Sequence, residues 1–233
     1  LDEQTNIVSQ IGKQKAIIAG PEKIIRNHEI DERIFKEFKK KKLSDVAYLI
    51  MGQSPKGDTY NDNEIGTVLI NGPSEFGRGS FDNPKKIKWT TQPTKYCLND
   101  DLLICVRGAT TGRTNIASFE ACIGRGIAII RAKDKRCQKY INYYLNCYKN
   151  KILSIAFGAM FPNLTSDQLN NFEIAFPFID KQESIIQEIN SQLIVVDGLT
   201  IMKNEAAKNI CKILKDVWGL EFIETSKSGG EDE

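Results

Sequence analysis

The segment Arg107–Asn115 has the most unusual composition in the chain. It follows the apolar run Leu102–Val106 and holds two glycines, two arginines and four hydroxyl or amide side chains. A phosphate-binding P-loop needs four residues between its glycines and then a lysine. Only three residues separate Gly108 from Gly112, and Arg113 takes the place of the lysine, so nucleotide hydrolysis is disfavoured. Arginine can donate two hydrogen bonds to guanine, so nucleic-acid binding is favoured over the alternative, a solvated turn.

Positive charge is concentrated around this segment. Residues 78–136 contain twelve Lys or Arg and five Asp or Glu, a net charge of +7 in a chain whose overall charge is +2. Arginine also stands beside glycine in Gly77-Arg78-Gly79 and Gly124-Arg125-Gly126. Lys85–Trp89 alternates like a strand with one basic face, and Trp89 is expected in the core. A charge run is usually a solvated face, but three such arginine sites favour a nucleic-acid surface.

Side chains that enzymes use are poorly represented. His28 is the single histidine and has no serine or cysteine nucleophile in a recognisable local context. Asp31, Glu37 and Lys39 loosely match metal-dependent nucleases, but a solvated helix face explains them more simply. The chain has no Asn-Pro-Pro-aromatic motif of the kind that adenine methyltransferases use, and no Gly-x-Gly cofactor loop after a strand. We therefore expect no catalysis, cofactor or metal in this chain.

The six cysteines are expected to be reduced, buried thiols. None has Cys-x-x-Cys spacing, and several lie in apolar segments such as Leu102–Val106. With a single histidine, a structural zinc site is disfavoured. No apolar run approaches the roughly 18 residues of a membrane span. These observations predict a cytoplasmic protein with no membrane partner.

Periodicity predicts helices at both ends of the chain and a β-rich body between them. A first helix over residues 1–19 is expected to end at Gly20-Pro21, and a second, short helix is expected through residues 24–38. Apolar runs between turn residues predict strands at 46–50, 68–70, 102–106 and 127–130. Further helices are predicted at 138–156, after a cap at Thr165, and from 182 to 218.

These elements define the expected fold class. It is an α+β fold in which a β-rich mixed domain is flanked by helices. The last helix is long enough to form a coiled coil, because its apolar stripe runs for about ten turns and exceeds what a compact body can cover. Residues 225–233 are polar and are expected to be disordered.

An ordered series of short motifs runs from residue 43 to residue 218. Its members are Leu43–Val46, Gly52–Pro55, Asn71–Pro73, Asn99–Leu103, Arg107–Arg113, Cys122–Gly126, Tyr140–Leu145, Phe157-Gly158, Leu164-Thr165, Leu169, Ile174–Pro177, Gln182-Glu183 and Ile185-Ile186. This order resembles the target recognition domain of type I restriction–modification specificity subunits. The resemblance implies a domain that binds one half of a bipartite DNA site in the major groove. It also implies long helices that act as a spacer and dock methyltransferase subunits.

Two departures from the family leave two forms open. Classical specificity subunits carry two such domains, whereas this chain has one. Gln14–Gly20, followed by Glu22–Ile25, also resembles the junction before the recognition domain of fused type IIG enzymes. Together with the start at Leu1, this leaves a half-size subunit that forms a homodimer through its C-terminal helix, or a recognition domain cut from or partnered with a methyltransferase.

The resemblance implies four segments and a set of partners. The segments are an N-terminal helical segment (1–42), a target recognition domain (43–180), a spacer and dimerisation helix (181–220) and a disordered tail (221–233). The partners are double-stranded DNA, an adenine methyltransferase that uses S-adenosylmethionine, and a restriction subunit with motor or nuclease activity. The expected DNA-binding residues are Gln53, Ser54, Lys56, Asn71, Arg78, Lys85, Lys88, Arg107, Thr110, Thr111, Arg113, Asn115 and Arg125.

Two other classes of function remain as alternatives. A coiled-coil adaptor that binds protein would let the basic residues scatter over the body. DNA binding instead needs Arg78, Lys88, Arg107, Arg113 and Arg125 on one concave face. A nuclease, the third class, would need carboxylates clustered in a cleft.

Overall fold

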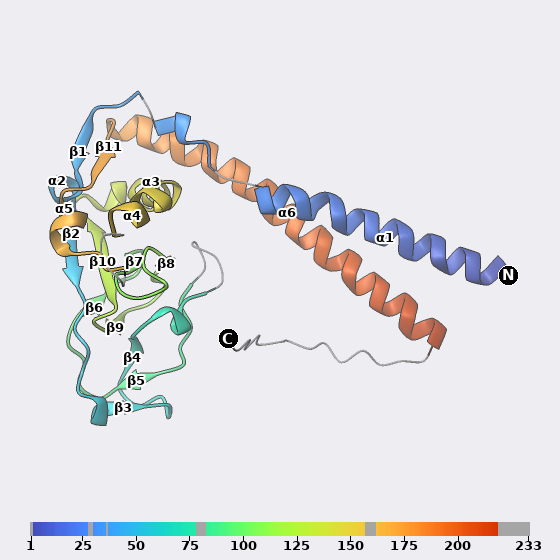
Figure 1. Cartoon of the computed structure of the whole chain (residues 1–233), viewed down its shortest axis with the longest axis horizontal. Helices are drawn as coiled ribbons and strands as arrows, with labels where there is room; N and C mark the ends of the chain where they lie inside the picture. Colours follow the sequence, from blue (N-terminus) through green and yellow to red (C-terminus); the bar gives the residue numbers. More distant parts are fainter. Residues whose placement is uncertain (1, 28–29, 36, 78–82, 157–161, 219–233) are drawn as a thin grey trace. The chain divides into compact units, whose positions relative to one another are not determined.

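The computed structural model describes residues 2–27, 30–35, 37–77, 83–156 and 162–218 (Figure 1). Its internal contacts divide the chain into two compact units. One consists of Leu1–Glu29 with Ile189–Glu233, and we call it the helical unit. The other is Ile30–Glu188, which we call the body.

Two sheets of short strands build the body. The first has the order β2-β10-β7-β8, and the second has the order β3-β5-β4-β9-β6. The bounds are β2 Ala47–Met51, β3 Tyr60–Asn61, β4 Thr67–Ile70, β5 Trp89–Thr90, β6 Tyr96–Cys97, β7 Leu102–Cys105, β8 Thr114–Ile116, β9 Ala121–Ile123 and β10 Ile127–Ala132. Strands predicted at 46–50, 68–70, 102–106 and 127–130 are confirmed as β2, β4, β7 and β10. Among these pairings β4 and β9 run parallel, and the others are antiparallel.

The core lies between the two sheets. One buried cluster joins Leu103, Ile127 and Ile129 of the first sheet to Ile70 and Ile123 of the second. β7 and β10 are inner strands of the first sheet, so both of their edges are paired. Their side chains are also buried on both faces of the sheet, and a strand covered in this way is expected to be apolar along its length.

Helices and one further sheet complete the body. The elements are β1 Lys40–Lys42, α2 Leu43–Val46, α3 Gln138–Cys147, α4 Lys149–Ala156, α5 Ser166–Asn170 and β11 Glu173–Ala175, with β1 paired to β11. The helix predicted over 138–156 is confirmed as α3 and α4, interrupted at Tyr148. Thr165 caps α5 as predicted: its hydroxyl accepts from the Gln168 N–H at 3.2 Å, and the Gln168 side chain accepts from the Thr165 N–H at 2.9 Å.

The short helix predicted through residues 24–38 is wrong. Residues 24–27 belong to α1, and the described residues between 30 and 38 contain only a 3₁₀ turn, at Glu32–Phe35. The Asp31 carboxylate accepts from the Arg33 N–H at 2.9 Å, and such a bond competes with helix formation. The apolar residues serve the body instead. Phe35 is 1% exposed, and its ring packs edge-on against Tyr144 at 5.0 Å.

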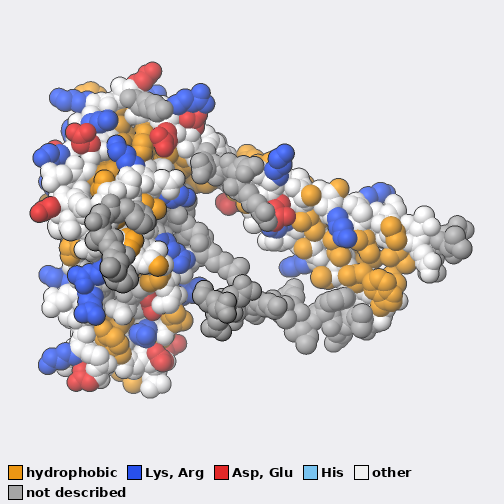
Figure 2. All heavy atoms as spheres, in the orientation of Figure 1, with side chains coloured by type: hydrophobic (Ala, Val, Ile, Leu, Met, Phe, Trp, Pro, Cys, Tyr) orange, Lys and Arg blue, Asp and Glu red, His pale blue; other side chains and the backbone are white. Residues whose placement is uncertain are grey.

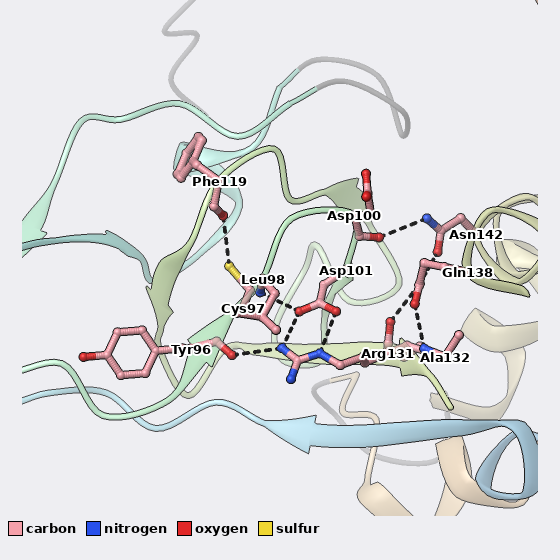
Figure 3. Close-up of polar contacts among 11 residues, drawn as sticks. Tyr96, Cys97, Leu98, Asp100, Asp101, Phe119, Arg131, Ala132, Gln138 and Asn142 are labelled. Carbon is pink, nitrogen blue, oxygen red and sulfur yellow. Dashed lines mark hydrogen bonds and ion pairs between the residues drawn. The ribbon is translucent and has the colours of Figure 1, made fainter. Parts of the chain in front are cut away.

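An ion pair fixes β10 to the turn before β7 (Figure 3). Arg131 donates from Nε to Asp101 Oδ1 at 2.9 Å and from Nη2 to Asp101 Oδ2 at 2.6 Å. Asp101 is 3% exposed and also accepts from the Leu98 N–H at 2.7 Å. One arginine of the basic segment therefore has a structural partner within the fold.

The helical unit contains α1 Asp2–Asn27 and the part of α6 Ile179–Trp218 from Ile189 onward. The expected end of the first helix at Gly20-Pro21 is wrong, because α1 continues through Pro21. In a helix interior proline is less favourable than alanine by about 3 kcal/mol, and tertiary packing can offset this cost. Pro21 is buried. The next residue, Glu22, forms an ion pair with Lys203 of α6, in which Glu22 Oε1 lies 3.8 Å from Lys203 Nζ.

The predicted fold class, α+β with a β-rich body and a long C-terminal helix, is confirmed. The tail expected to be disordered (221–233) lies outside the described residues. In the part of the chain that the structure describes, no helix is long and apolar enough to span a membrane.

Candidate nucleic-acid interface

Residues 107–113 form a tight loop between β7 and β8, and residues 114 and 115 begin β8. We call residues 107–115 together the first loop, or the 107–115 loop. The Gly112 N–H donates to the Cys105 carbonyl at 2.8 Å. Gly108 and Gly112 have φ values of +79° and +84°, a backbone conformation that favours glycine. A Cβ atom on Gly112 would lie 2.7 Å from a side-chain carbon of Leu153, so the loop passes close beneath α4. Both glycines are therefore required by the shape of the loop.

The segment that begins at Pro162 supports this loop. The Pro162 carbonyl accepts from the Gly108 N–H at 3.1 Å, and Arg107 pairs with Asn163 in an isolated β-bridge. The Thr111 hydroxyl lies 2.7 Å from the Gly108 carbonyl oxygen and 3.1 Å from that of Pro162. Thr111 is 4% exposed. Its burial does not support the expectation that it contacts DNA; its hydroxyl shapes the loop instead.

Arg113 and Asn115 hold both backbone groups of Gly77. Arg113 donates from Nη2 to the Gly77 carbonyl at 2.7 Å, and Asn115 Oδ1 accepts from the Gly77 N–H at 3.2 Å. Asn115 is 0% exposed, so direct contact with DNA is not supported for it either. Arg113 is half-buried. Because one guanidinium carries five N–H donors, this bond leaves further donors on Arg113.

A second group of predicted residues meets where β2, β4 and β9 end. Ser54 donates from Oγ to Asn71 Oδ1 at 3.3 Å and accepts from the Arg125 N–H at 3.1 Å. The Gln53 N–H donates to the Ile123 carbonyl at 3.1 Å. The sequence could only suggest these residues one by one. The structure brings four of them together: Gln53, Ser54, Asn71 and Arg125.

Close backbone approach makes this meeting possible. A Cβ atom on Gly124 would lie 2.0 Å from Asn71 Oδ1, and one on Gly52 would lie 2.2 Å from the Gly124 carbonyl oxygen. The Gly124 N–H also donates to the Ile70 carbonyl at 2.9 Å. Side chains at these two glycines would force the three strand ends apart.

The two groups are joined to each other. The Val106 N–H, at the start of the first loop, donates to the Gly126 carbonyl at 2.8 Å, directly beside Arg125. Four segments are therefore linked by hydrogen bonds: residues 52–56, 71–77, 106–115 and 123–126. We call them the interface loops.

Exposure divides the predicted residues into three classes. Exposed side chains are Gln53, Lys56, Lys85, Arg107 and Arg125; half-buried ones are Ser54, Asn71, Lys88, Thr110 and Arg113; buried ones are Thr111 and Asn115. Arg78 lies outside the described residues. The exposed and half-buried members are those that a ligand could reach.

The basic strand predicted at Lys85–Trp89 is wrong in most of its length. Only Trp89–Thr90 forms a strand, β5, while the Lys85 N–H donates to the Glu75 carbonyl at 2.6 Å and the Lys88 carbonyl accepts from the Leu69 N–H at 2.7 Å. Trp89 is 8% exposed, so its predicted place in the core is confirmed. Lysines 85 and 88 are thus held by their backbones beside the interface loops.

Part of the positive charge of residues 78–136 is neutralised within the protein. Arg131 pairs with the buried Asp101, and Arg136 pairs with Asp134 at 2.7 Å. Within the described residues, Arg107 and Arg125 form no ion pair. The interface loops therefore carry cations whose charge is available to an anionic ligand.

Cys105 lies at the base of the first loop as a protonated thiol. Burial raises its pKa to about 11, although the Thr110 hydroxyl and the Arg113 charge act in the opposite direction. All six cysteines are free, as expected, and Cys97, Cys105, Cys122 and Cys137 are buried. The expectation of burial is wrong for two: Cys147 is half-buried and Cys211 is exposed.

Several supporting residues had no sequence signal of their own. The sequence marked Gly77 only as a neighbour of Arg78, yet its N–H donates to Asn115 and its carbonyl accepts from Arg113. The Pro162 carbonyl accepts from the Thr111 hydroxyl, and Thr94 donates its hydroxyl to the Gln53 carbonyl. Such residues contribute through backbone groups or a single hydroxyl, which no motif marks. No cluster of His, Cys, Asp or Glu suited to holding a metal ion occurs among the described residues; His28 lies outside them.

Comparisons with known proteins match this chain to one family. The family model of the type I restriction modification DNA specificity domain matches residues 35–216. A relative from Methanocaldococcus jannaschii, described as a type I restriction enzyme MjaX specificity subunit, is 30% identical over 237 residues. The match covers 94% of this chain and 54% of the relative.

Solved structures have the same fold. A chain from a type I R-M system, studied for its complex assembly and conformational transition, gives a TM-score of 0.67 at 23% identity, covering 92% of this chain and 54% of that one. The HsdS subunit from Thermoanaerobacter tengcongensis gives 0.63 at 24% identity, covering 94% and 58%. The chain therefore spans little more than half the length of these proteins.

Proposed function

Because the chain belongs to the type I restriction–modification DNA specificity family, we propose that its body recognises one half of a bipartite site in duplex DNA through the interface loops. The observation that carries this proposal is the meeting of four loops that are far apart in sequence. They bring Gln53, Asn71, Arg107 and Arg125 to one place on a rigid two-sheet scaffold. Sites of this kind, loops on a rigid scaffold, are typical of binding surfaces.

The chemistry of these four side chains suits base recognition. Arginine can donate two hydrogen bonds to O6 and N7 of guanine, and asparagine or glutamine can form two with N6 and N7 of adenine. Arg107, Arg125 and Gln53 are exposed, and Asn71 is half-buried. We assign them to contacts in the major groove, where the four base pairs can be distinguished.

The lysines beside the loops are assigned to phosphate contacts. Lys56 and Lys85 are exposed, and Lys88 is half-buried. Lysine presents a flexible point charge, which fits phosphate oxygens and carries no sequence information. Ser54 and Thr110 are half-buried hydroxyls, which we also assign to the DNA backbone.

Catalysis is assigned to partner proteins. Specificity subunits are non-catalytic components of restriction–modification complexes. We propose that this chain directs an adenine-N6 methyltransferase, which binds S-adenosylmethionine, and a restriction subunit to their target in cytoplasmic DNA. The methyltransferase must extrude its adenine from the duplex, and a partner that holds the DNA in register supports that step.

A second copy of the chain is proposed as a further partner. The described residues form one recognition body, and the relatives that this chain matches are almost twice as long. A bipartite site needs two such bodies. Self-association through α6 would supply the second, because exposed apolar residues line that helix within the helical unit.

Titration of duplex DNA at several salt concentrations tests the proposed binding. Six phosphate contacts would lower the affinity roughly a thousandfold between 50 and 200 mM salt. Binding that does not respond to salt, or no binding even with the cognate methyltransferase present, would contradict the proposal and favour a protein-binding adaptor.

Comparing DNA methylation in cells with and without the intact gene tests the biological role. We expect one bipartite adenine motif to lose its methylation when the gene is deleted. A variant with Arg107 and Arg125 both replaced by alanine should have the same effect, because both replaced side chains are exposed in the interface loops. Unchanged methylation in the deletion strain would refute a role in DNA specificity.

A further inference from the structure

Positive charge alone does not mark where this body reads a base. Lys and Arg side chains are spread over the face of the body that Figure 2 shows. A cation that contacts phosphate carries no sequence information, whereas an amide that contacts a base edge does. Asn71, which directly follows β4, is an amide of the interface loops whose two ends have different surroundings.

The oxygen of the Asn71 amide faces the protein. Asn71 Oδ1 accepts from the Ser54 hydroxyl at 3.3 Å, and the same hydroxyl accepts from the Arg125 N–H at 3.1 Å. Asn71 Oδ1 also lies in the space that a side chain at residue 124 would fill, so it packs against Gly124. Two of the neighbouring interface loops therefore enclose this oxygen.

The partners of the amide determine which of its ends is the oxygen, as hydrogen-bond networks do for asparagine in general. Ser54 has one hydroxyl hydrogen, and the Arg125 N–H already occupies one of its lone pairs. Exchanging the oxygen and nitrogen of Asn71 would give Ser54 a second donor and deprive its own hydrogen of the present acceptor. It would also place an NH₂ group against the Cα–H of Gly124, which carries a slight positive charge. The oxygen is therefore the inward end.

The nitrogen of the same amide is accessible. Asn71 is half-buried, and within the described part of the chain its Nδ2 has no hydrogen-bond partner. Among the described side chains Gln182 Oε1 is the one buried polar atom without a partner, so Asn71 Nδ2 is open to solvent. Asn71 thus offers a ligand two N–H donors, while its acceptor is engaged by Ser54.

We propose that Asn71 reads a guanine in the major groove through Nδ2 alone, an inference that rests on the proposed recognition of DNA by the interface loops. Guanine presents two adjacent acceptors, O6 and N7, and lysine reads it with a single donor nitrogen. Adenine presents a donor, N6, beside N7, so asparagine reads adenine with both ends of its amide. Asn71 has no free oxygen for that pattern. Thymine offers one acceptor, O4, beside a methyl group.

Ser54 is then a positioning residue. Its single hydroxyl hydrogen is given to Asn71 Oδ1, so this role replaces the DNA backbone contact assigned to Ser54 above. Arg125 takes part through its backbone N–H, which leaves its exposed side chain available to DNA. The chain of bonds from Arg125 through Ser54 to Asn71 thus sets which base is accepted.

Selection from random duplexes by the full chain identifies the position that Asn71 reads. One G·C pair of the wild-type motif should lose its preference in Asn71→Ala, while the other positions stay the same. At that position any other base pair should weaken wild-type binding roughly fivefold to 150-fold, the usual cost of one mismatched pair. The matched control is Asn63→Ala, because Asn63 is exposed in the body and lies outside the interface loops. It should leave the motif unchanged.

A base analogue tests the contact with unaltered protein. Replacing the guanine at that position by 7-deazaguanine removes the N7 acceptor and keeps the base pair. Wild-type binding should weaken roughly twofold to tenfold, the effect of one hydrogen bond. Binding of Asn71→Ala should not weaken further, because this variant has already lost the contact.

Replacing Ser54 tests the orientation of the amide. In Ser54→Ala the Asn71 amide can turn its oxygen outward, so adenine becomes acceptable at the same position. The preference for guanine over adenine there should fall at least about fivefold, with the other positions unchanged. Ser54→Thr keeps a hydroxyl and should keep the preference for guanine. A purely structural role of Ser54 would instead weaken binding to all duplexes alike.

The outcomes separate this inference from the proposed function. A wild-type chain that selects no sequence, with or without the methyltransferase, would refute both. A motif whose Asn71-dependent position holds adenine or thymine in place of guanine, or a motif that Asn71→Ala leaves unchanged, would overturn the inference alone. Circular dichroism establishes that each variant is folded. If a variant is not, wild-type affinity that 7-deazaguanine leaves unchanged at every guanine of the motif would still overturn the inference.

Discussion

Replacing Arg113 by alanine is expected to remove sequence discrimination without removing a phosphate contact. Its Nη2 group donates to the Gly77 carbonyl at 2.7 Å, while Asn115 accepts from the Gly77 N–H at 3.2 Å. Two side chains of the 107–115 loop therefore hold the segment 71–77, which also carries Asn71. Without Arg113 the Gly77 carbonyl loses its charged donor. The segment 71–77 is then held less firmly, and the Asn71 side chain is less well fixed in place.

The magnitude follows from the geometry. A hydrogen bond from a charged donor contributes about 1.5–3 kcal/mol to stability, and a half-buried arginine belongs at the lower end, so Arg113→Ala should destabilise the body by about 1.5 kcal/mol. Loss of one base-specific contact costs about 1–3 kcal/mol in discrimination, roughly fivefold to 150-fold. The same range of about 1–3 kcal/mol is expected in two cases: Arg113 contacts a base through its remaining N–H donors, or Arg113 holds Asn71 in position to contact one.

The assay is a competition titration at several salt concentrations. Selection from random duplexes first identifies the bound sequence, and each variant is then titrated with that duplex and with a scrambled one. Lys88→Ala is the matched control, since it removes one cation that we assign to phosphate. It should weaken binding equally on both duplexes and flatten the salt slope by about one, whereas Arg113→Ala should affect the selected duplex and leave the slope unchanged.

Equal losses on both duplexes, with a salt slope reduced by about one, would refute this reasoning for Arg113. Its side chain would then bind a phosphate, and the bond to Gly77 would have to break in the complex. Arg113→Lys adds a second criterion. Lysine keeps the charge but has no planar guanidinium fork, so it should rescue a phosphate contact and fail to rescue the bond geometry at Gly77.

Three further outcomes test the scaffold of the interface loops. Gly112→Ala should destabilise the body by about 1–3 kcal/mol in urea unfolding, because alanine is strained at a φ of +84° and meets a side chain of α4. Cys105 should resist alkylation at pH 8 while Cys211 reacts. Since burial raises the pKa of Cys105 to about 11, above its unfolded value near 9, its contribution to stability is complete below pH 9 and is lost as the pH rises toward 11. Arg131→Ala should cost about 3 kcal/mol because it leaves a buried carboxylate unpaired, whereas Arg136→Ala, which breaks an exposed pair, should not change the denaturation midpoint.

The scaffold could be predicted where local pattern and burial agree. β7 and β10 are continuous apolar runs because both edges are paired and both faces are covered. The cap at Thr165 is a local bond pattern with its own sequence signal, a Gln three residues later. α6 is marked by a stripe that recurs over ten turns, a signal too long to arise from a strand.

Prediction failed where distant contacts override local preference. α1 passes through Pro21, which is buried in the helical unit. The run around Phe35 has helical spacing, yet its aromatic side chain packs into the body and leaves only a 3₁₀ turn. At Lys85–Lys88 the charges alternate as in a strand, but partners for a full ladder are missing among the described residues, and single backbone bonds to Glu75 and Leu69 hold the segment instead.

The candidate site shows why residue type alone cannot separate a ligand-binding side chain from one that holds a loop. Arg107, Thr111 and Asn115 belong to one motif and are all polar, yet the first is exposed and the other two are 4% and 0% exposed. The difference arises from Pro162 and Gly77, whose backbone groups need hydrogen-bond partners once they are buried. A buried backbone group far away in the sequence thus decides that Thr111 and Asn115 face inward. Among the described residues Arg107 and Arg125 are exposed and form no ion pair, whereas Arg131 is paired with the buried Asp101. Ser54, Asn71 and Arg113 are intermediate, because each is half-buried and bonded to another loop yet keeps part of its side chain accessible to a ligand.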